Sequence, residues 1–110
     1  MRIIFMGTSS FGVPILKKLI DLRKDIVAVI TQPDRPCGRG KKTQPSPIKT
    51  VALQSDLNVI QPEDINDKKT ISEIRRLQPD LIILVAYGQI LSSQVLKLPS
   101  KGCLNIHPSL

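Results

Sequence analysis

The chain has 110 residues, of which 41% are hydrophobic and 3% aromatic, with a formal net charge of +7. This length allows one domain with its own core and excludes two, and the longest apolar run, residues 81–86, is far shorter than the ~20 residues of a membrane span. The charge favours an anionic partner, and two cysteines without metal-ligand or disulfide spacing favour a reducing, cytoplasmic setting and argue against a metal site.

The first thirty residues predict a strand, a helix and a second strand. Residues 2–6 form a short apolar strand, and residues 25–31 form another. Between them, five apolar residues fall on one face of a helix: Phe11, Ile15, Leu16, Leu19 and Ile20. Two parallel strands joined by a right-handed crossover are expected.

The turn before this helix, G-T-S-S-F-G at residues 7–12, occupies the place of a dinucleotide-binding motif. Ser9 stands where the second glycine would allow a pyrophosphate to approach the backbone, so a nicotinamide-dependent dehydrogenase is rejected. The serines can cap the helix, and a helix N-terminus of this kind can also hold an anion.

A long basic loop follows the second strand. Residues 32–47 contain four prolines, two glycines and no apolar periodicity, which is typical of a long loop that is functional or disordered. Residues 32–49 carry one acid, Asp34, and five basic residues: Arg35, Arg39, Lys41, Lys42 and Lys49. Basic loops bind phosphates and RNA. Two interpretations therefore stay open, an RNA contact and a solvated loop without a partner.

The remaining elements continue the alternation of strands and helices. They are a helix over 47–56, a strand over 58–62, a helix over 66–78 capped by Asn66 or Asp67, a strand over 80–88, a short helix around 92–97 and a strand over 103–107. Five strands in this order predict an α/β fold, a Rossmann-like open, mainly parallel sheet with helices on both faces. Ligands of such sheets bind beyond the carboxyl ends of the strands, here the loops 7–10, 32–47, 87–91 and 107–110.

The only histidine lies in C-L-N-I-H-P-S-L, residues 103–110. Strand alternation places Asn105 and His107 on one face, about 6–7 Å apart, with Leu104 and Ile106 opposite. An amide can donate to an oxygen on which negative charge develops, and an imidazole can move protons. The pair suits acyl transfer, although an isolated N-x-H also occurs by chance.

Several stretches of the sequence form a recognisable series. They are R-I-I-F-M-G-T at residues 2–8, T-Q-P-D-R-P, G-R-G-K-K and P-S-P within 31–47, V-A-Y-G-Q-I-L at 85–91 and N-I-H-P-S-L at 105–110. In this order they resemble the methionyl-tRNA formyltransferases, within the formyl-tetrahydrofolate-dependent transferases. The likeness covers the whole chain. The loop within 31–47 is its most specific part, and N-I-H-P-S-L marks the wider group.

The resemblance implies transfer of a formyl group from 10-formyltetrahydrofolate to the amino group of methionyl initiator tRNA, in translation initiation, by a monomeric cytoplasmic enzyme without a metal. Asn105 would be the oxyanion-stabilising amide and His107 the catalytic imidazole. The residues expected to bind the folate are Gly88, Gln89, Ile90, Leu91, Ser109 and Leu110. Those expected to bind the tRNA acceptor arm are Arg35, Arg39, Lys41 and Lys42.

Members of this family continue past the matching segment with a catalytic aspartate, the rest of the catalytic domain and a C-terminal tRNA-binding domain. We therefore expect residues 1–110 to be the N-terminal portion of a catalytic domain, as a fragment or a truncated gene product. We also expect the isolated chain to be marginally stable or to self-associate, because an interior strand would be left at a sheet edge.

Three other functions stay open. A folate-dependent transferase acting on a small amine, such as a purine-pathway ribonucleotide or an amino sugar, would need no basic loop of this kind. A non-catalytic RNA-binding α/β fragment would need the loop but not Asn105 and His107. A catalytically inactive remnant would need neither.

Overall fold

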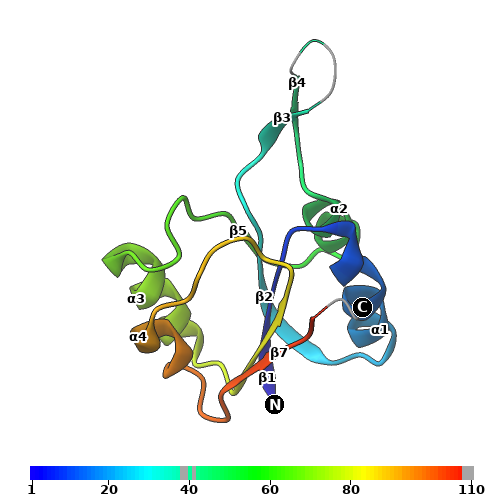
Figure 1. The fold of residues 1–110 in the computed structure, drawn as a ribbon. Helices are drawn as coiled ribbons and strands as arrows, with labels where there is room; N and C mark the ends of the chain where they lie inside the picture. The colour runs from blue at the N-terminus through cyan, green and yellow to red at the C-terminus, as the bar shows by residue number, and fades with distance from the viewer. Residues whose placement is uncertain (38–39, 41, 108–110) are drawn as a thin grey trace.

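A parallel sheet of five strands forms the centre of the computed structural model, which describes residues 1–37, 40 and 42–107 (Figure 1). The strands are β1 (Arg2–Gly7), β2 (Asp25–Ile30), β5 (Val59–Ile60), β6 (Leu81–Val85) and β7 (Cys103–Asn105). Their order is β5-β2-β1-β6-β7, and every pairing is parallel. All five carboxyl ends therefore lie along one edge of the sheet.

Helices cover both faces of this sheet. Two of them, α1 (Val13–Asp21) and α2 (Pro47–Gln54), contribute to the core of one face, and α3 (Lys68–Leu77) and α4 (Ser93–Leu96) to that of the other. A single 3₁₀ turn, η1 (Ser10–Gly12), precedes α1. Side-chain caps start the other helices: Ser46, Asp67 and Ser92 each accept a hydrogen bond from a backbone N–H in the first turn.

The two faces of the core follow from alternation along the strands. In β1, Ile4 and Met6 pack toward α3 and α4, whereas Ile3 and Phe5 pack toward α1 and α2. All four are almost completely buried. The nearly continuous apolar runs of β1 and β6 thus belong to strands that are covered on both sides.

The predicted fold class is confirmed, as are all five strands of the sheet, with ends that differ by a few residues. Asp67 rather than Asn66 is the N-cap of α3. Phe11 was expected on the buried face of the first helix. It lies instead in η1, before α1 begins, and is 64% exposed.

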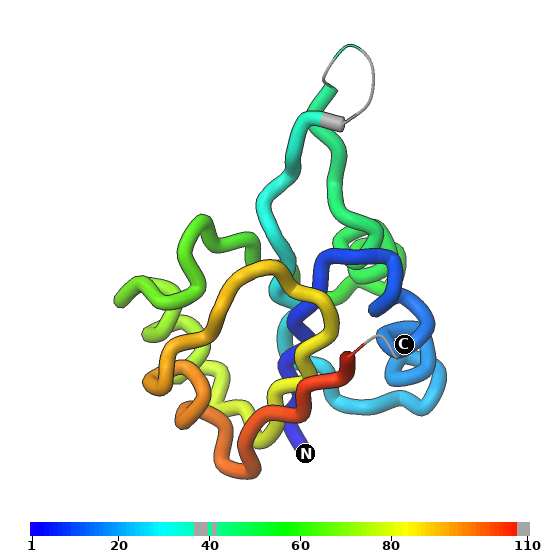
Figure 2. Tube along the Cα trace, viewed as in Figure 1, coloured from blue at the N-terminus to red at the C-terminus, as the bar shows by residue number. Residues whose placement is uncertain are grey.

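The prediction of an irregular loop over residues 32–47 is wrong for part of its length. Two short strands, β3 (Arg35–Cys37) and β4 (Lys42–Gln44), pair antiparallel in a separate two-stranded sheet. We call β3 and β4 together the basic hairpin. It extends away from the body of the molecule beyond the carboxyl edge of the main sheet (Figures 1 and 2).

Within the residues described, β7 pairs with β6 alone and ends the sheet. Leu104 on this strand is half exposed. The expected position of β7 at an edge is therefore confirmed. No helix among the described residues has both the length and the apolar character that crossing a membrane requires.

Tyr87, which follows β6, is buried in the core between the sheet and the helices α3 and α4. Its hydroxyl is the only buried side-chain polar atom without a hydrogen-bond partner among residues 1–37, 40 and 42–107. Burial, with a smaller contribution from Asp64, raises the pKa of this hydroxyl to about 12. The ordinary pKa of tyrosine is about 10.

Alkaline titration tests this burial directly, because Tyr87 is the only tyrosine. The pKa in the folded chain lies above that in the unfolded chain, so the contribution of the neutral hydroxyl is complete below about pH 10 and is lost as the pH rises to about 12. We expect tyrosinate absorbance to appear near pH 12 and the free energy of unfolding to fall across this window. In Tyr87→Phe the free energy of unfolding should not show this fall between about pH 10 and pH 12. At neutral pH it should be higher by about 1 kcal/mol, because the substitution removes the buried hydroxyl that has no partner. Ionisation near pH 10 without unfolding would contradict the burial.

Candidate functional site

The loops at the carboxyl edge of the sheet are joined by hydrogen bonds to Thr8, the residue after β1. Its hydroxyl donates to the Tyr87 carbonyl at 2.6 Å and accepts from the Gln32 backbone N–H at 3.2 Å. Its own N–H donates to the Ala86 carbonyl at 3.1 Å. Three of the four loops that the sequence placed at this edge are therefore in direct contact.

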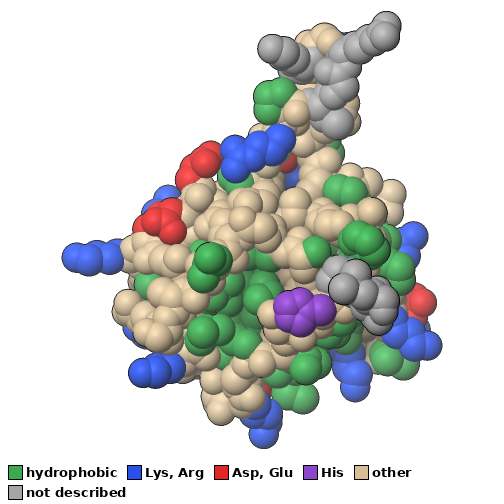
Figure 3. Space-filling view, viewed as in Figure 1, with side chains coloured by type: hydrophobic (Ala, Val, Ile, Leu, Met, Phe, Trp, Pro, Cys, Tyr) green, Lys and Arg blue, Asp and Glu red, His purple; other side chains and the backbone are tan. Residues whose placement is uncertain are grey.

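Asn105 and His107 lie at the carboxyl end of β7. Asn105 is level with Leu84 of β6, and the Ile106 N–H donates to the Leu84 carbonyl at 2.8 Å, so the pairing continues past the last strand residue. Ile106 packs against the core on the α1 and α2 side. Strand alternation then directs Asn105 and His107 to the other side, where both are exposed. Figure 3 shows the histidine on the surface beside a patch of hydrophobic side chains.

The segment 86–91, which we call the β6 loop, directly follows β6. Ala86 and Gly88 have φ angles of 47° and 104°, so the chain turns sharply here. A side chain at position 88 would be strained by this φ, and its Cβ would lie 2.9 Å from the Gln32 amide nitrogen. Only glycine suits this position.

Gln89 fixes the β6 loop to its surroundings through four hydrogen bonds. Its amide nitrogen donates to the Gln32 side-chain oxygen at 2.7 Å and, at 3.2–3.3 Å, to two backbone carbonyls in the segment after β5, those of Pro62 and Glu63. Its amide oxygen accepts from the Ile65 N–H at 2.7 Å. The side chain of Gln89 is thus directed into the protein, and its polar atoms are already occupied by hydrogen bonds within the chain.

The other expected folate-binding residues of the β6 loop differ in exposure. Gly88 is exposed and Ile90 is 89% exposed, whereas Leu91 is buried in the core on the α3 and α4 side. The structure therefore leaves the Gly88 backbone and the Ile90 side chain free to touch a ligand. Ser109 and Leu110 lie outside the described residues.

Two of the four expected tRNA-binding residues are described. Arg35 is the first residue of β3 and Lys42 the first of β4, and both are exposed on the basic hairpin. Arg39 and Lys41 lie outside the described residues. A groove of about 310 Å³ lies between Thr8 and Ser9 and the base of the hairpin, and four of its nine lining residues are prolines.

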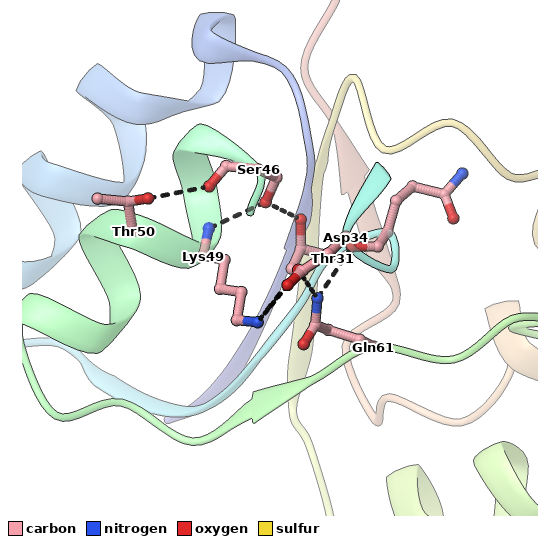
Figure 4. Close-up of polar contacts among 7 residues, drawn as sticks. Thr31, Asp34, Ser46, Lys49, Thr50 and Gln61 are labelled. Carbon is pink, nitrogen blue, oxygen red and sulfur yellow. Dashed lines mark hydrogen bonds and ion pairs between the residues drawn. The ribbon is translucent and has the colours of Figure 1, made fainter. Parts of the chain in front are cut away.

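Lys49 is the fifth basic residue of the cluster found in the sequence, and it is committed to an ion pair. Its ammonium nitrogen lies 3.1 Å from both carboxylate oxygens of Asp34 (Figure 4). Gln61 donates to the same carboxylate at 2.7 Å. The Gln61 amide and the Lys49 ammonium hold the pKa of the Asp34 carboxyl below its usual range. Among the described residues of this cluster, Arg35 and Lys42 are exposed, whereas Lys49 is engaged by Asp34.

Sequence reasoning missed the polar residues that hold these loops together: Thr8, Gln32, Gln61 and Gln89 as an internal anchor. Gln61 directly follows β5, so the rule that sites gather at the carboxyl ends of strands could have identified it. No group of three or more His, Cys, Asp or Glu side chains in the described part of the chain is arranged to hold a metal ion.

Comparisons with known proteins agree over the whole chain. A family model described as "Formyl transferase" matches residues 1–110. Two curated proteins named methionyl-tRNA formyltransferase, from Geobacter sulfurreducens and Moorella thermoacetica, are each 52% identical over 110 residues. The chain spans 35% of the length of each of these relatives.

A solved structure shares the fold. Glycinamide ribonucleotide transformylase 1 from Geobacillus kaustophilus is similar with a TM-score of 0.65 and 18% sequence identity, over 99% of this chain and 58% of that one. At this level of identity the likeness concerns the fold alone.

Replacing Gln89 by methionine tests its role as an anchor. Methionine is similar in length but makes none of the four hydrogen bonds, so we expect Gln89→Met to lower the free energy of unfolding by about 2 kcal/mol, measured by urea denaturation. The matched control is Gln94→Met on the exposed face of α4, where we expect a change within about 0.5 kcal/mol. Equal effects of the two substitutions would contradict the anchoring role.

Proposed function

The chain belongs to the formyl transferase family, and on this premise we propose that it serves the transfer of a formyl group from 10-formyltetrahydrofolate to the amino group of methionyl initiator tRNA. The observation that carries the proposal is the whole-chain match, at 52% identity, to relatives named methionyl-tRNA formyltransferase. This activity belongs to translation initiation and so to the cytoplasm.

Because the chain spans about a third of these relatives, we propose that residues 1–110 are the N-terminal portion of a catalytic domain. The remainder of that domain and a C-terminal tRNA-binding domain would complete the enzyme. The exposed edge at β7 supports this proposal, since it offers unpaired backbone groups to a further strand.

Asn105 and His107 are proposed as the catalytic pair. Both side chains are exposed at the carboxyl end of β7, on one side of the sheet. The Asn105 amide would donate to the formyl oxygen as negative charge develops on it. His107 would accept a proton as the methionyl nitrogen forms its new bond to the formyl carbon and would return it to the departing nitrogen of the donor.

The β6 loop is proposed as one wall of the folate site, with Ser109 and Leu110 continuing it. The folate supplies the formyl carbon when bound. The fit rests on three features of the loop. Gly88 lacks a Cβ where one would strain the turn, and the hydrogen bonds of the Gln89 side chain fix the loop backbone to the protein. Ile90, the next residue, is exposed. Such a loop presents backbone donors and acceptors, with an apolar side chain, to a planar ring.

The basic hairpin is proposed to contact the acceptor arm of the tRNA, through Arg35, Arg39, Lys41 and Lys42. The hairpin projects beyond the carboxyl edge of the sheet (Figure 1), so its positive charges lie away from Asn105 and His107. A large polyanion can bind them there. A small amine needs no such extension. The hairpin therefore favours tRNA over a ribonucleotide or an amino sugar as the formyl acceptor.

Formyl transfer by the natural polypeptide that carries residues 1–110 tests the reaction. We expect 10-formyltetrahydrofolate to formylate methionyl-tRNA and not glycinamide ribonucleotide. Asn105→Ala and His107→Gln should each lower kcat/KM by about 10²–10³. Activity kept by both variants would contradict the catalytic pair, and near-normal turnover by the 110 residues alone would contradict the domain proposal.

The role of the hairpin has a separate test. We expect the double variant Arg35→Ala with Lys42→Ala to bind tRNA more weakly. The slope of the logarithm of the binding constant against the logarithm of the salt concentration should become smaller in magnitude by about 2, because each residue would neutralise one phosphate. Binding of 10-formyltetrahydrofolate should be unchanged. The control pair is Lys24→Ala with Lys101→Ala, two exposed lysines at the amino edge of the sheet. Equal losses of tRNA and folate binding, or equal losses from both pairs, would overturn the assignment.

A further inference from the structure

The direction of the basic hairpin is set at its base. Its strands β3 and β4 pair with each other and not with the main sheet. The segments that flank the hairpin are joined below these strands by a buried hydrogen bond of 2.6 Å between the Thr31 and Ser46 hydroxyls (Figure 4). Residues 31–34 and 46–49 therefore connect the hairpin to the body of the molecule.

Asp34 connects three separate elements at this base. Its carboxylate accepts from Lys49 in the first turn of α2 and from Gln61, which follows β5. Gln61 also donates to the Gln32 carbonyl at 3.3 Å, so one amide group binds the segment before β3 at two points. The Lys49 and Asp34 side chains are 20% and 31% exposed, so water reaches this pair only in part.

The charge of Asp34 opposes the charge of the segment that contains it. It is the only acid in residues 32–49, which hold five basic residues. If net charge alone governed the attraction of a polyanion, an acid here would weaken binding. Its contacts indicate a structural role, because they hold the segment before β3 between α2 and the end of β5.

We propose that Asp34 is a positioning residue for the nucleic-acid partner: through Lys49 and Gln61 it fixes the angle at which the basic hairpin leaves the sheet. This inference rests on the proposed function, because it takes an RNA phosphate backbone as the partner of the hairpin. Holding the hairpin in one direction reduces the ordering that binding would otherwise require.

The test uses Asp34→Asn, which keeps the shape of the side chain and removes its charge. Two quantities are measured on the natural polypeptide that carries residues 1–110: ¹⁵N relaxation order parameters of the amides in β3 and β4, and the dissociation constant of labelled methionyl initiator tRNA. We expect the order parameters to fall from about 0.85 toward 0.6. We expect the dissociation constant to rise about fivefold, although the protein has become more positive.

Two further variants separate position from charge. Asp21→Asn removes an exposed acid at the end of α1, and we expect it to leave the order parameters unchanged and tRNA binding equal or slightly tighter. The exchange of Asp34→Lys with Lys49→Asp restores an ion pair at the same net charge. It should recover part of the lost order and part of the lost affinity, because the ion pair returns but the carboxylate that accepts from Gln61 does not.

Each outcome decides one part of the proposal. Unchanged order parameters in Asp34→Asn would overturn the positioning role, whatever happens to tRNA binding. A looser hairpin with equal or tighter tRNA binding would overturn the claim that its direction serves the nucleic acid. If the unaltered protein bound no tRNA, the proposed function and the partner named here would both fail, while the order parameters would still decide whether Asp34 fixes the hairpin.

Discussion

The burial of β1 on both faces is the constraint on which the rest of the structure depends. Ile4, Phe5 and Met6 have no exposed surface, and the strand has parallel neighbours on both sides. A central parallel strand requires crossover connections, and these connections are the helices that bury it. The same arrangement directs all five carboxyl ends to one edge. Residues far apart in the sequence thus meet there without any local motif that unites them.

Three glutamine side chains join the loops at this edge through hydrogen bonds of their amide groups. Gln32, Gln61 and Gln89 come from the ends of three different strands or loops and are linked in one series of hydrogen bonds. Each amide can donate and accept, and its side chain is long enough to reach a neighbouring loop without carrying a charge. The basic hairpin and the β6 loop are consequently parts of one polar framework.

Features that depend on burial could be predicted from the sequence, and features that depend on exposed or long-range polar contacts could not. The apolar runs of β1 and β6 are stable only when both faces of the sheet are covered, so they predict a buried parallel sheet. The period of two along a strand placed Asn105 and His107 on one side of β7. The hairpin was missed because β3 and β4 are three residues long, exposed or proline-containing, and leave no apolar pattern. Phe11 has helical spacing but precedes the helix, so spacing alone misplaced it. The Gln89 network joins residues up to 57 positions apart, which no local pattern reveals.

The strand order also has a consequence for the way the chain is made. β1 is synthesised first, yet one of its two neighbours, β6, begins at residue 81. At the usual rate of protein synthesis, several seconds separate the completion of β2 from that of β6, and during this time one side of β1 has no partner. Asn105 and His107 come later still. The candidate site therefore exists only when almost the whole of this segment has left the ribosome, so an incomplete chain would contain the hairpin before it contained Asn105 and His107.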